Sequence, residues 1–160
     1  MSDTKKIFDT EAGFRAAIDL TLTSAQREIR VFDRDLAHMG LSDRMHAELL
    51  INFLKGGRSR RLRIVVHDTD WIERNAPRLL SLLRLHSYAI EVRRTPEHLR
   101  ELTDCWMLAD EASGAIRYHA DHARGELIAH SPADVQAWWQ RFDELWEASE
   151  PCSPGSVTGL

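Results

Sequence analysis

The spacing of hydrophobic residues along the chain changes between two patterns. Apolar residues three or four positions apart are typical of helices that bury one face. This spacing predicts helices at residues 11–25, 41–57, 75–87 and 131–149. Alternating or β-branched apolar residues are typical of strands. They predict strands at residues 28–33, 61–70, 88–94, 104–110, 114–119 and 125–130.

The order of these elements predicts the fold class. Helices and strands alternate through the first part of the chain, which indicates an α/β protein with helices on both faces of a mostly parallel sheet. The later strands follow one another across short turns, so we expect a mixed sheet. The predicted organisation is an N-terminal tail at 1–7, one α/β domain at 8–150, and a disordered tail at 151–160 that is rich in Pro, Gly and Ser.

Composition narrows the class of protein. The chain has 160 residues, of which 43% are hydrophobic and 29% charged, as in an ordinary globular domain. Its net charge of −4 gives no overall attraction to nucleic acid or to an anionic membrane. No apolar run approaches the ~20 residues that cross a bilayer, and the first residues lack the apolar core of a secretory signal. Since Cys105 and Cys152 stand far apart, we expect a cytoplasmic protein without a disulfide framework or a membrane span.

One segment, "LTDCWMLAD" at 102–110, is a strand that leads into an acidic turn. It follows three strands, "EIRVFDRDL", "LRIVVHD" and "AIEVRR", and precedes an aromatic helix that contains "FDELW". Over roughly residues 8–149 this layout resembles one half of a phospholipase D-like protein, and in particular an uncharacterised bacterial group of such domains. The resemblance implies a phospholipase D-like single unit.

The motif that gives this family its chemistry is absent. The strand at 102–110 corresponds to the one that carries H-x-K-x-x-x-x-D in active members, where the resemblance implies a histidine that attacks phosphorus and a lysine that holds the phosphate. Alignment on Asp110 places Thr103 at the histidine and Cys105 at the lysine. Threonine needs an adjacent base to act as a nucleophile, and cysteine carries no positive charge. No lysine in the chain has histidine two residues before it, so we expect no catalytic residue of this kind.

Strand alternation places Thr103 and Cys105 on the same face of this segment. If that face lines the ancestral cleft, Cys105 is a candidate nucleophile or redox thiol. The interpretation we prefer is a buried, small hydrophobic residue, because no histidine or lysine stands nearby in the sequence to activate the thiol.

Carboxylates follow the predicted strands. A candidate ligand or metal site consists of Asp33, Asp35, His67, Asp68 and Asp70. Ligands of open α/β sheets bind beyond the carboxyl ends of strands, and carboxylate oxygens suit Mg²⁺ or Ca²⁺. A second cluster, His119, Asp121, His122 and His130, lacks a recognised zinc spacing. We prefer the simpler interpretation for both groups, in which Asp and His make local hydrogen bonds in turns and at strand ends.

Basic residues form two groups in the sequence. The candidate phosphate contacts are Arg58, Arg60, Arg61, Arg93 and Arg94. No aromatic residues are interleaved with the basic run to stack on bases. A solvated loop is therefore preferred, and nucleic acid is not an expected partner.

The sequence favours a non-catalytic phospholipase D-like domain that binds a ligand or a partner, with no cofactor and no bound metal. The resemblance adds a homodimer, since half-length active members join two motifs across a dyad. The alternatives are a metal-assisted phosphodiester hydrolase with a relocated acidic site, and a nucleic-acid accessory domain. The sequence does not identify the small molecule or protein that is bound.

Overall fold

The computed structural model describes residues 5–155. In this part of the chain an eight-stranded sheet has the order β1-β7-β6-β5-β2-β3-β4-β8. Its parallel part consists of β2 (Glu28–Asp33), β3 (Arg61–Val66) and β4 (Ile90–Arg94). The remaining strands pair antiparallel: β1 (Lys5–Phe8), β5 (Cys105–Ala109), β6 (Ser113–His119), β7 (His122–Ile128) and β8 (Glu150–Cys152). The predicted mixed α/β sheet is confirmed, but it is not mostly parallel, because within residues 5–155 only the β2–β3 and β3–β4 pairings are parallel.

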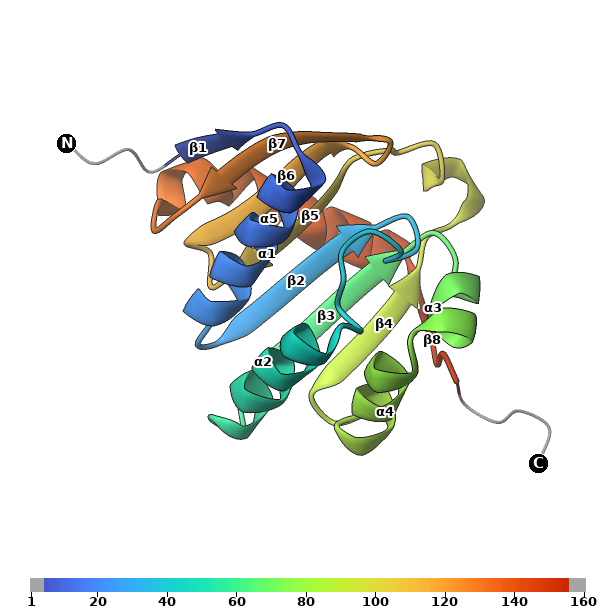
Figure 1. The fold of residues 1–160 in the computed structure, drawn as a ribbon. Helices are drawn as coiled ribbons and strands as arrows, with labels where there is room; N and C mark the ends of the chain where they lie inside the picture. Colours follow the sequence, from blue (N-terminus) through green and yellow to red (C-terminus); the bar gives the residue numbers. More distant parts are fainter. Residues whose placement is uncertain (1–4, 156–160) are drawn as a thin grey trace, which may run out of the picture.

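Helices cover both faces of the sheet (Figure 1). One face carries α1 (Glu11–Ser24), α2 (Arg44–Lys55), α3 (Asp70–Asn75) and α4 (Pro77–Leu85). The long helix α5 (Pro132–Ala148) lies across the other face. A short 3₁₀ helix, η1 (Glu97–Leu99), connects β4 to β5. None of the helices within residues 5–155 combines the length and apolar character needed to cross a membrane.

Strand alternation divides the interior into two cores. On β5, Cys105 and Met107 point to the core under α1–α4, whereas Trp106 and Leu108 point to the core under α5. Trp106 is fully buried, and its ring packs 5.5 Å from Phe32 and 6.0 Å from Phe142, measured between ring centroids. The aromatic stripe of α5 is therefore a packing surface for the sheet.

The predicted helix at 75–87 is α4 in the structure, and a short helix that was not predicted, α3, comes before it. Helix α3 ends at Asn75, and α4 starts at Pro77. Between them Ala76 has φ −122° and ψ 61°, which is not helical. Proline disfavours helical backbone at the residue before it, so Pro77 separates the two helices.

The sheet extends further than the predicted domain boundaries. Residues 5–7 were expected in a tail but pair with β7 as part of β1, and residues 151–152 were expected in a tail but pair with β4 as part of β8. Both strands cover sheet edges that would otherwise expose a row of backbone N–H and C=O groups. Of the other tail residues, 153–155 follow β8 outside any helix or strand, and 1–4 and 156–160 lie outside the described residues.

Candidate functional site

The candidate site lies at the end of the sheet where β2 stops, β5 starts and β6 stops. Because β5 runs antiparallel to both neighbours, Asp33, Cys105 and Arg117 come from distant parts of the chain to one place. Cys105 pairs directly with Arg117 across the β5–β6 ladder, so the two side chains lie on the same face of the sheet. This is where the resemblance places the motif chemistry.

Cys105, at the position of the motif lysine, is a core residue. Its side chain is 2% exposed and faces the core under α1. Burial raises the pKa of the Cys105 thiol well above its usual range, and the nearby Asp33 carboxylate raises it further. A protonated thiol is a poor nucleophile and carries no charge to hold a phosphate.

Thr103, at the position of the motif histidine, lies before the start of β5 and is exposed. Its carbonyl oxygen accepts a hydrogen bond of 2.7 Å from the Ala120 backbone N–H. Within the described residues its hydroxyl has no hydrogen-bond partner, so no base there removes its proton. Threonine without such a base is not an effective nucleophile.

Arg117 is a site residue that the sequence analysis missed. Its side chain is buried, and its two terminal nitrogens donate to both carboxylate oxygens of Glu11 at 2.8 and 3.0 Å. It also donates to the backbone oxygens of His119 and Ala120, and its guanidinium lies 5.0 Å from the Phe14 ring centroid. The only signal in the sequence is an arginine within the apolar strand "GAIRYH".

The two partners of this ion pair shift each other's pKa. The hydrogen bond from Arg117 lowers the pKa of the Glu11 carboxyl. Burial is the largest single effect and works against the charge of Arg117, but the hydrogen bonds to Glu11 and the nearby negative charges of Glu11 and Asp33 together outweigh it and raise the pKa of Arg117. Both groups are thus charged at neutral pH, and the bidentate geometry is the one by which arginine holds carboxylates and phosphates. In this structure the guanidinium is occupied by a carboxylate of the same chain.

Asp33 is the buried carboxyl of the site. It is 4% exposed, and one of its oxygens accepts a hydrogen bond of 2.6 Å from the Arg34 backbone N–H. Burial raises the pKa of Asp33 to about 6, although the backbone hydrogen bond partly opposes this shift. The site therefore combines a neutral thiol, a carboxyl that resists ionisation and a cation that is already paired.

Asp110, the acidic end of the motif, has a structural role at the opposite end of β5. Its carboxylate accepts hydrogen bonds from three successive backbone N–H groups, those of Gln26 (2.8 Å), Arg27 (2.8 Å) and Glu28 (2.9 Å). These bonds tie the β5–β6 turn to the segment that enters β2. Asp110, the one motif position with the expected residue type, therefore stabilises the connection between β5–β6 and β2.

The predicted acidic site is not assembled in the structure. Asp35 accepts from the Ala37 N–H at 2.9 Å, and Asp68 accepts from the Asp70 N–H at 3.2 Å, as expected for aspartates in turns. His119 accepts from the Asp121 N–H within the β6–β7 turn. Across residues 5–155 no three His, Cys, Asp or Glu side chains gather closely enough to hold a metal ion.

His67, the candidate base, connects three segments. It is 5% exposed, with Nδ1 2.7 Å from the Thr95 hydroxyl and Nε2 2.8 Å from the Leu102 carbonyl oxygen. A carbonyl oxygen can only accept, so Nε2 carries a proton and, in the neutral ring, Nδ1 accepts from Thr95. Both nitrogens are used inside the fold, where His67 fixes the segment that leads into Thr103.

The two arginine groups lie at opposite ends of the sheet. The β3–β4 register pairs Leu62 with Ile90 and Val66 with Arg94, so Arg94 is a full strand length away from Arg61. Arg60 donates to the Phe53 carbonyl at the end of α2, and Arg93 donates to the Trp146 carbonyl at the end of α5. Arg60 and Arg93 therefore cap helices.

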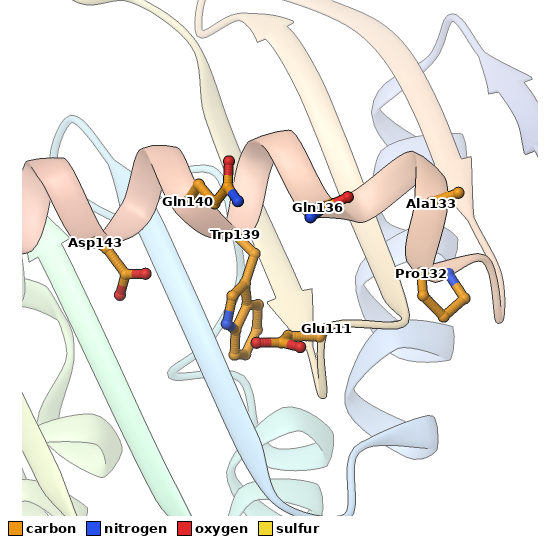
Figure 2. Close-up of a pocket in the computed structure, with 7 residues that line it drawn as sticks. All are labelled: Glu111, Pro132, Ala133, Gln136, Trp139, Gln140 and Asp143. Carbon is orange, nitrogen blue, oxygen red and sulfur yellow. The ribbon is translucent and has the colours of Figure 1, made fainter.

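A hollow of about 500 Å³ lies beside α5, away from the motif positions (Figure 2). It is lined by Glu111, Pro132, Ala133, Gln136, Trp139, Gln140 and Asp143. The Glu111 carboxylate lies against the Trp139 indole in Figure 2. The buried Arg30 guanidinium covers this ring at 3.8 Å from its centroid and pairs with Asp143 at 3.0 Å. Arg30, the cation beside this hollow, therefore already packs on Trp139 and pairs with Asp143.

Comparison with protein families gives a single family. Residues 10–154 match the family described as "Domain of unknown function (DUF7931)". The chain belongs to this family. A comparison with curated proteins finds no match.

Solved structures with the same fold confirm the phospholipase D-like resemblance. TrmBL2, an archaeal chromatin protein whose structure shows a novel mode of DNA binding, is 16% identical with a TM-score of 0.69, and the match covers 94% of this chain and 54% of TrmBL2. Nuc from Salmonella typhimurium, a phospholipase D family member, is 11% identical with a TM-score of 0.60, over 92% of this chain and 97% of Nuc.

Phosphatidylserine synthase from Haemophilus influenzae Rd KW20 is 12% identical with a TM-score of 0.61, and the match covers 94% of this chain and 40% of the synthase. This chain therefore spans about half of TrmBL2 and less than half of the synthase. At these identities the likeness establishes the fold.

Proposed function

We propose that this domain is a non-catalytic phospholipase D-like domain that acts by binding a small molecule or a protein partner. The observation that carries the proposal is the environment of Cys105. At the position of the motif lysine stands a buried, protonated thiol beside Arg117, whose guanidinium is held by Glu11. A site that transfers a phosphoryl group needs a nucleophile and a free positive charge for the phosphate oxygens.

Each of these requirements is missing from the residues at the motif positions. Thr103 has no hydrogen-bonded base among the described residues, and Cys105 is neutral. Arg117 would have to lose two short hydrogen bonds to Glu11 before it could contact a phosphate. Arg117 is buried, so its guanidinium would then be left without a partner in the core, which is unfavourable.

The metal-assisted hydrolase has less support. It requires Asp33, Asp35, Asp68 and Asp70 to share an ion, but within residues 5–155 no three such side chains gather closely enough to hold one. The carboxylates of Asp33, Asp35 and Asp68 instead accept hydrogen bonds from nearby backbone N–H groups. The binding proposal includes a homodimer, by analogy with half-length members of the superfamily that this chain resembles. Sedimentation equilibrium of the purified chain measures this part of the proposal directly.

The test is turnover of a generic phosphodiester, bis(p-nitrophenyl) phosphate, by the wild type and by the Thr103→Ala and Cys105→Ala variants, with and without added Mg²⁺. We expect all three proteins to release nitrophenol at the rate of buffer alone. Turnover that disappears in either variant would overturn the proposal. Turnover that depends on Mg²⁺ and survives both substitutions would favour the metal-assisted alternative.

A further inference from the structure

One end of the molecule carries cations that have no acidic partners. α2 ends at Lys55, the following turn contains Arg58, β3 begins at Arg61, and the last turn of α4 contains Arg84. Among the residues that the structure describes, none of these four side chains forms an ion pair. The carboxyl ends of α2 and α4 lie at the end of the sheet where β3 and β4 start (Figure 1). We name these four residues the basic end.

Tyr88 places an exposed aromatic ring at the basic end. It lies in the turn before β4 and is 64% exposed, one of the most exposed large apolar side chains described. Pairing of β3 with β4 brings this turn to the start of β3, where the Leu62 N–H donates to the Ala89 carbonyl at 2.9 Å. The basic run at residues 55–63 contains no aromatic residue, and Tyr88 is distant from it in the sequence. The pairing of β3 with β4 brings Tyr88 close to this run.

A hollow of about 290 Å³ joins the ring to the cations. It is lined by Arg61, Leu62, Arg63, Ser87, Tyr88, Ala89, Ile90 and Glu91. Its one carboxylate, Glu91, already accepts a hydrogen bond of 3.0 Å from Arg93. Tyr88, Arg61 and Arg63 all line this hollow, so a ligand in it can contact both the aromatic ring and guanidinium groups.

Arg61 and Arg58 differ in whether their side chains form hydrogen bonds within the fold. One terminal nitrogen of Arg61 donates to the carbonyl oxygens of Arg58 and Arg60, both at 2.9 Å, and thereby closes the turn. Its other nitrogens have no hydrogen bond within the described part of the chain. Arg58 contributes only its carbonyl oxygen to this turn, and its side chain is exposed. Arg58 is therefore the residue that can be changed with the smallest effect on the fold.

We propose that the basic end and Tyr88 bind single-stranded nucleic acid. Arginine and lysine side chains contact phosphates, and an exposed aromatic ring stacks on an unpaired base without sequence preference. The net charge of −4 repels a polyanion from the molecule as a whole, so contact is confined to the end where the charge is positive. This surface is at the opposite end of the sheet from Cys105 and Arg117, so it does not depend on the motif positions.

The experiment measures fluorescence anisotropy of a labelled oligothymidylate titrated with the whole protein at low salt. We expect saturable binding that weakens as salt rises, with a slope of about −2 in log K against log salt for about three phosphate contacts. Tyr88→Ala should weaken binding by about 5-fold or more, the loss of one stacked base. Arg58→Glu should weaken it by about 10-fold, and circular dichroism should show an unchanged melting temperature.

Arg94→Glu is the matched control, because it makes the same charge change at an exposed position at the other end of the sheet. It should bind like the wild type apart from a small effect of net charge. Equal losses in Arg58→Glu and Arg94→Glu would overturn the proposal, as would no binding at low salt. Binding to heparin or to vesicles that contain phosphatidylserine, with no response of oligothymidylate binding to Tyr88→Ala, would also overturn it and indicate a general polyanion surface.

Discussion

Burial decides the chemistry of the single residues at the candidate site. Asp33 and Cys105 are both buried where β2 ends and β5 begins, and burial favours the uncharged form of each side chain. The same environment would disfavour a lysine at position 105. The environment of Cys105 therefore favours an uncharged side chain at this position of the sheet.

The raised pKa of Asp33 makes the stability of the folded protein depend on pH. Its pKa is about 6 in the folded protein and 3.8 in the reference state, so the folded state binds more protons between these values. Stability from Asp33 is therefore highest below pH 3.8 and falls as the pH rises to about 6. The difference between these two pKa values corresponds to a free energy of unfolding that is about 3 kcal/mol lower at neutral pH than below pH 3.8. We expect Asp33→Asn to raise the free energy of unfolding at pH 7.5 and to change it little at pH 4.

Urea denaturation of the wild type and the variant at several pH values measures this effect. The difference between the two proteins removes the contribution of the other carboxyl groups, such as Glu11, whose pKa is lowered and which acts in the opposite direction. A stability gain of Asp33→Asn that is the same at pH 4 and at pH 7.5 would contradict a raised pKa for Asp33.

The sequence could predict some of these residues and not others. Alternation along β5 was enough to place Cys105 and Trp106 on opposite faces. The pairing of Glu11 with Arg117 joins residues 106 positions apart, and neither stands in a motif. Sequence periodicity carries no information about such long-range contacts, because they depend on the order of strands in the sheet.

At the scale of elements, the β5–β6 hairpin depends on its turn. Asp110 and Glu111 both have left-handed backbone, with φ of 59° and 57°. The cost of the left-handed backbone at Asp110 is offset by three hydrogen bonds from backbone N–H groups to its carboxylate. The Glu111 side chain makes no such hydrogen bonds in the described structure. We expect Asp110→Ala to lower the free energy of unfolding by about 2–3 kcal/mol, because it removes a charged acceptor from three N–H groups.

Glu111→Gly is the neighbouring control. Glycine adopts positive φ without the steric cost of a Cβ, so this change should raise stability by up to about 1 kcal/mol. Both variants can be compared by thermal unfolding. An Asp110→Ala variant that is as stable as the wild type would contradict the role assigned to the Asp110 carboxylate.

Element boundaries were harder to predict than element types. The short edge strands β1 and β8 have four and three residues, too few for a periodic pattern to stand out. They form because β7 and β4 offer free edges, which is a property of the assembled sheet. The break between α3 and α4 could have been predicted, since Pro77 marks it in the sequence.

At the scale of the whole molecule, two regions lie at opposite ends of the sheet. The order of elements in the sequence does not show that they are separate. At one end, Cys105 and Arg117 are buried, and the exposed Glu11 pairs with Arg117. At the other, the basic end and Tyr88 are exposed. The fold class and its superfamily resemblance were predictable, because they rest on the order of elements. The closure of the motif site was not, because it depends on a residue of β6 that meets a residue of α1.

The measurement that tests this closure most directly is the reactivity of Cys105 in the native protein. Cys152→Ser leaves Cys105 as the single thiol, and Cys152 is only partly buried, at the margin of the core on the edge strand β8. With a disulfide reagent at neutral pH, we expect Cys105 to stay unmodified until the protein is unfolded in urea, and then to react at the rate of a free thiol. Rapid modification of Cys105 in the folded protein would contradict a sealed, non-catalytic site.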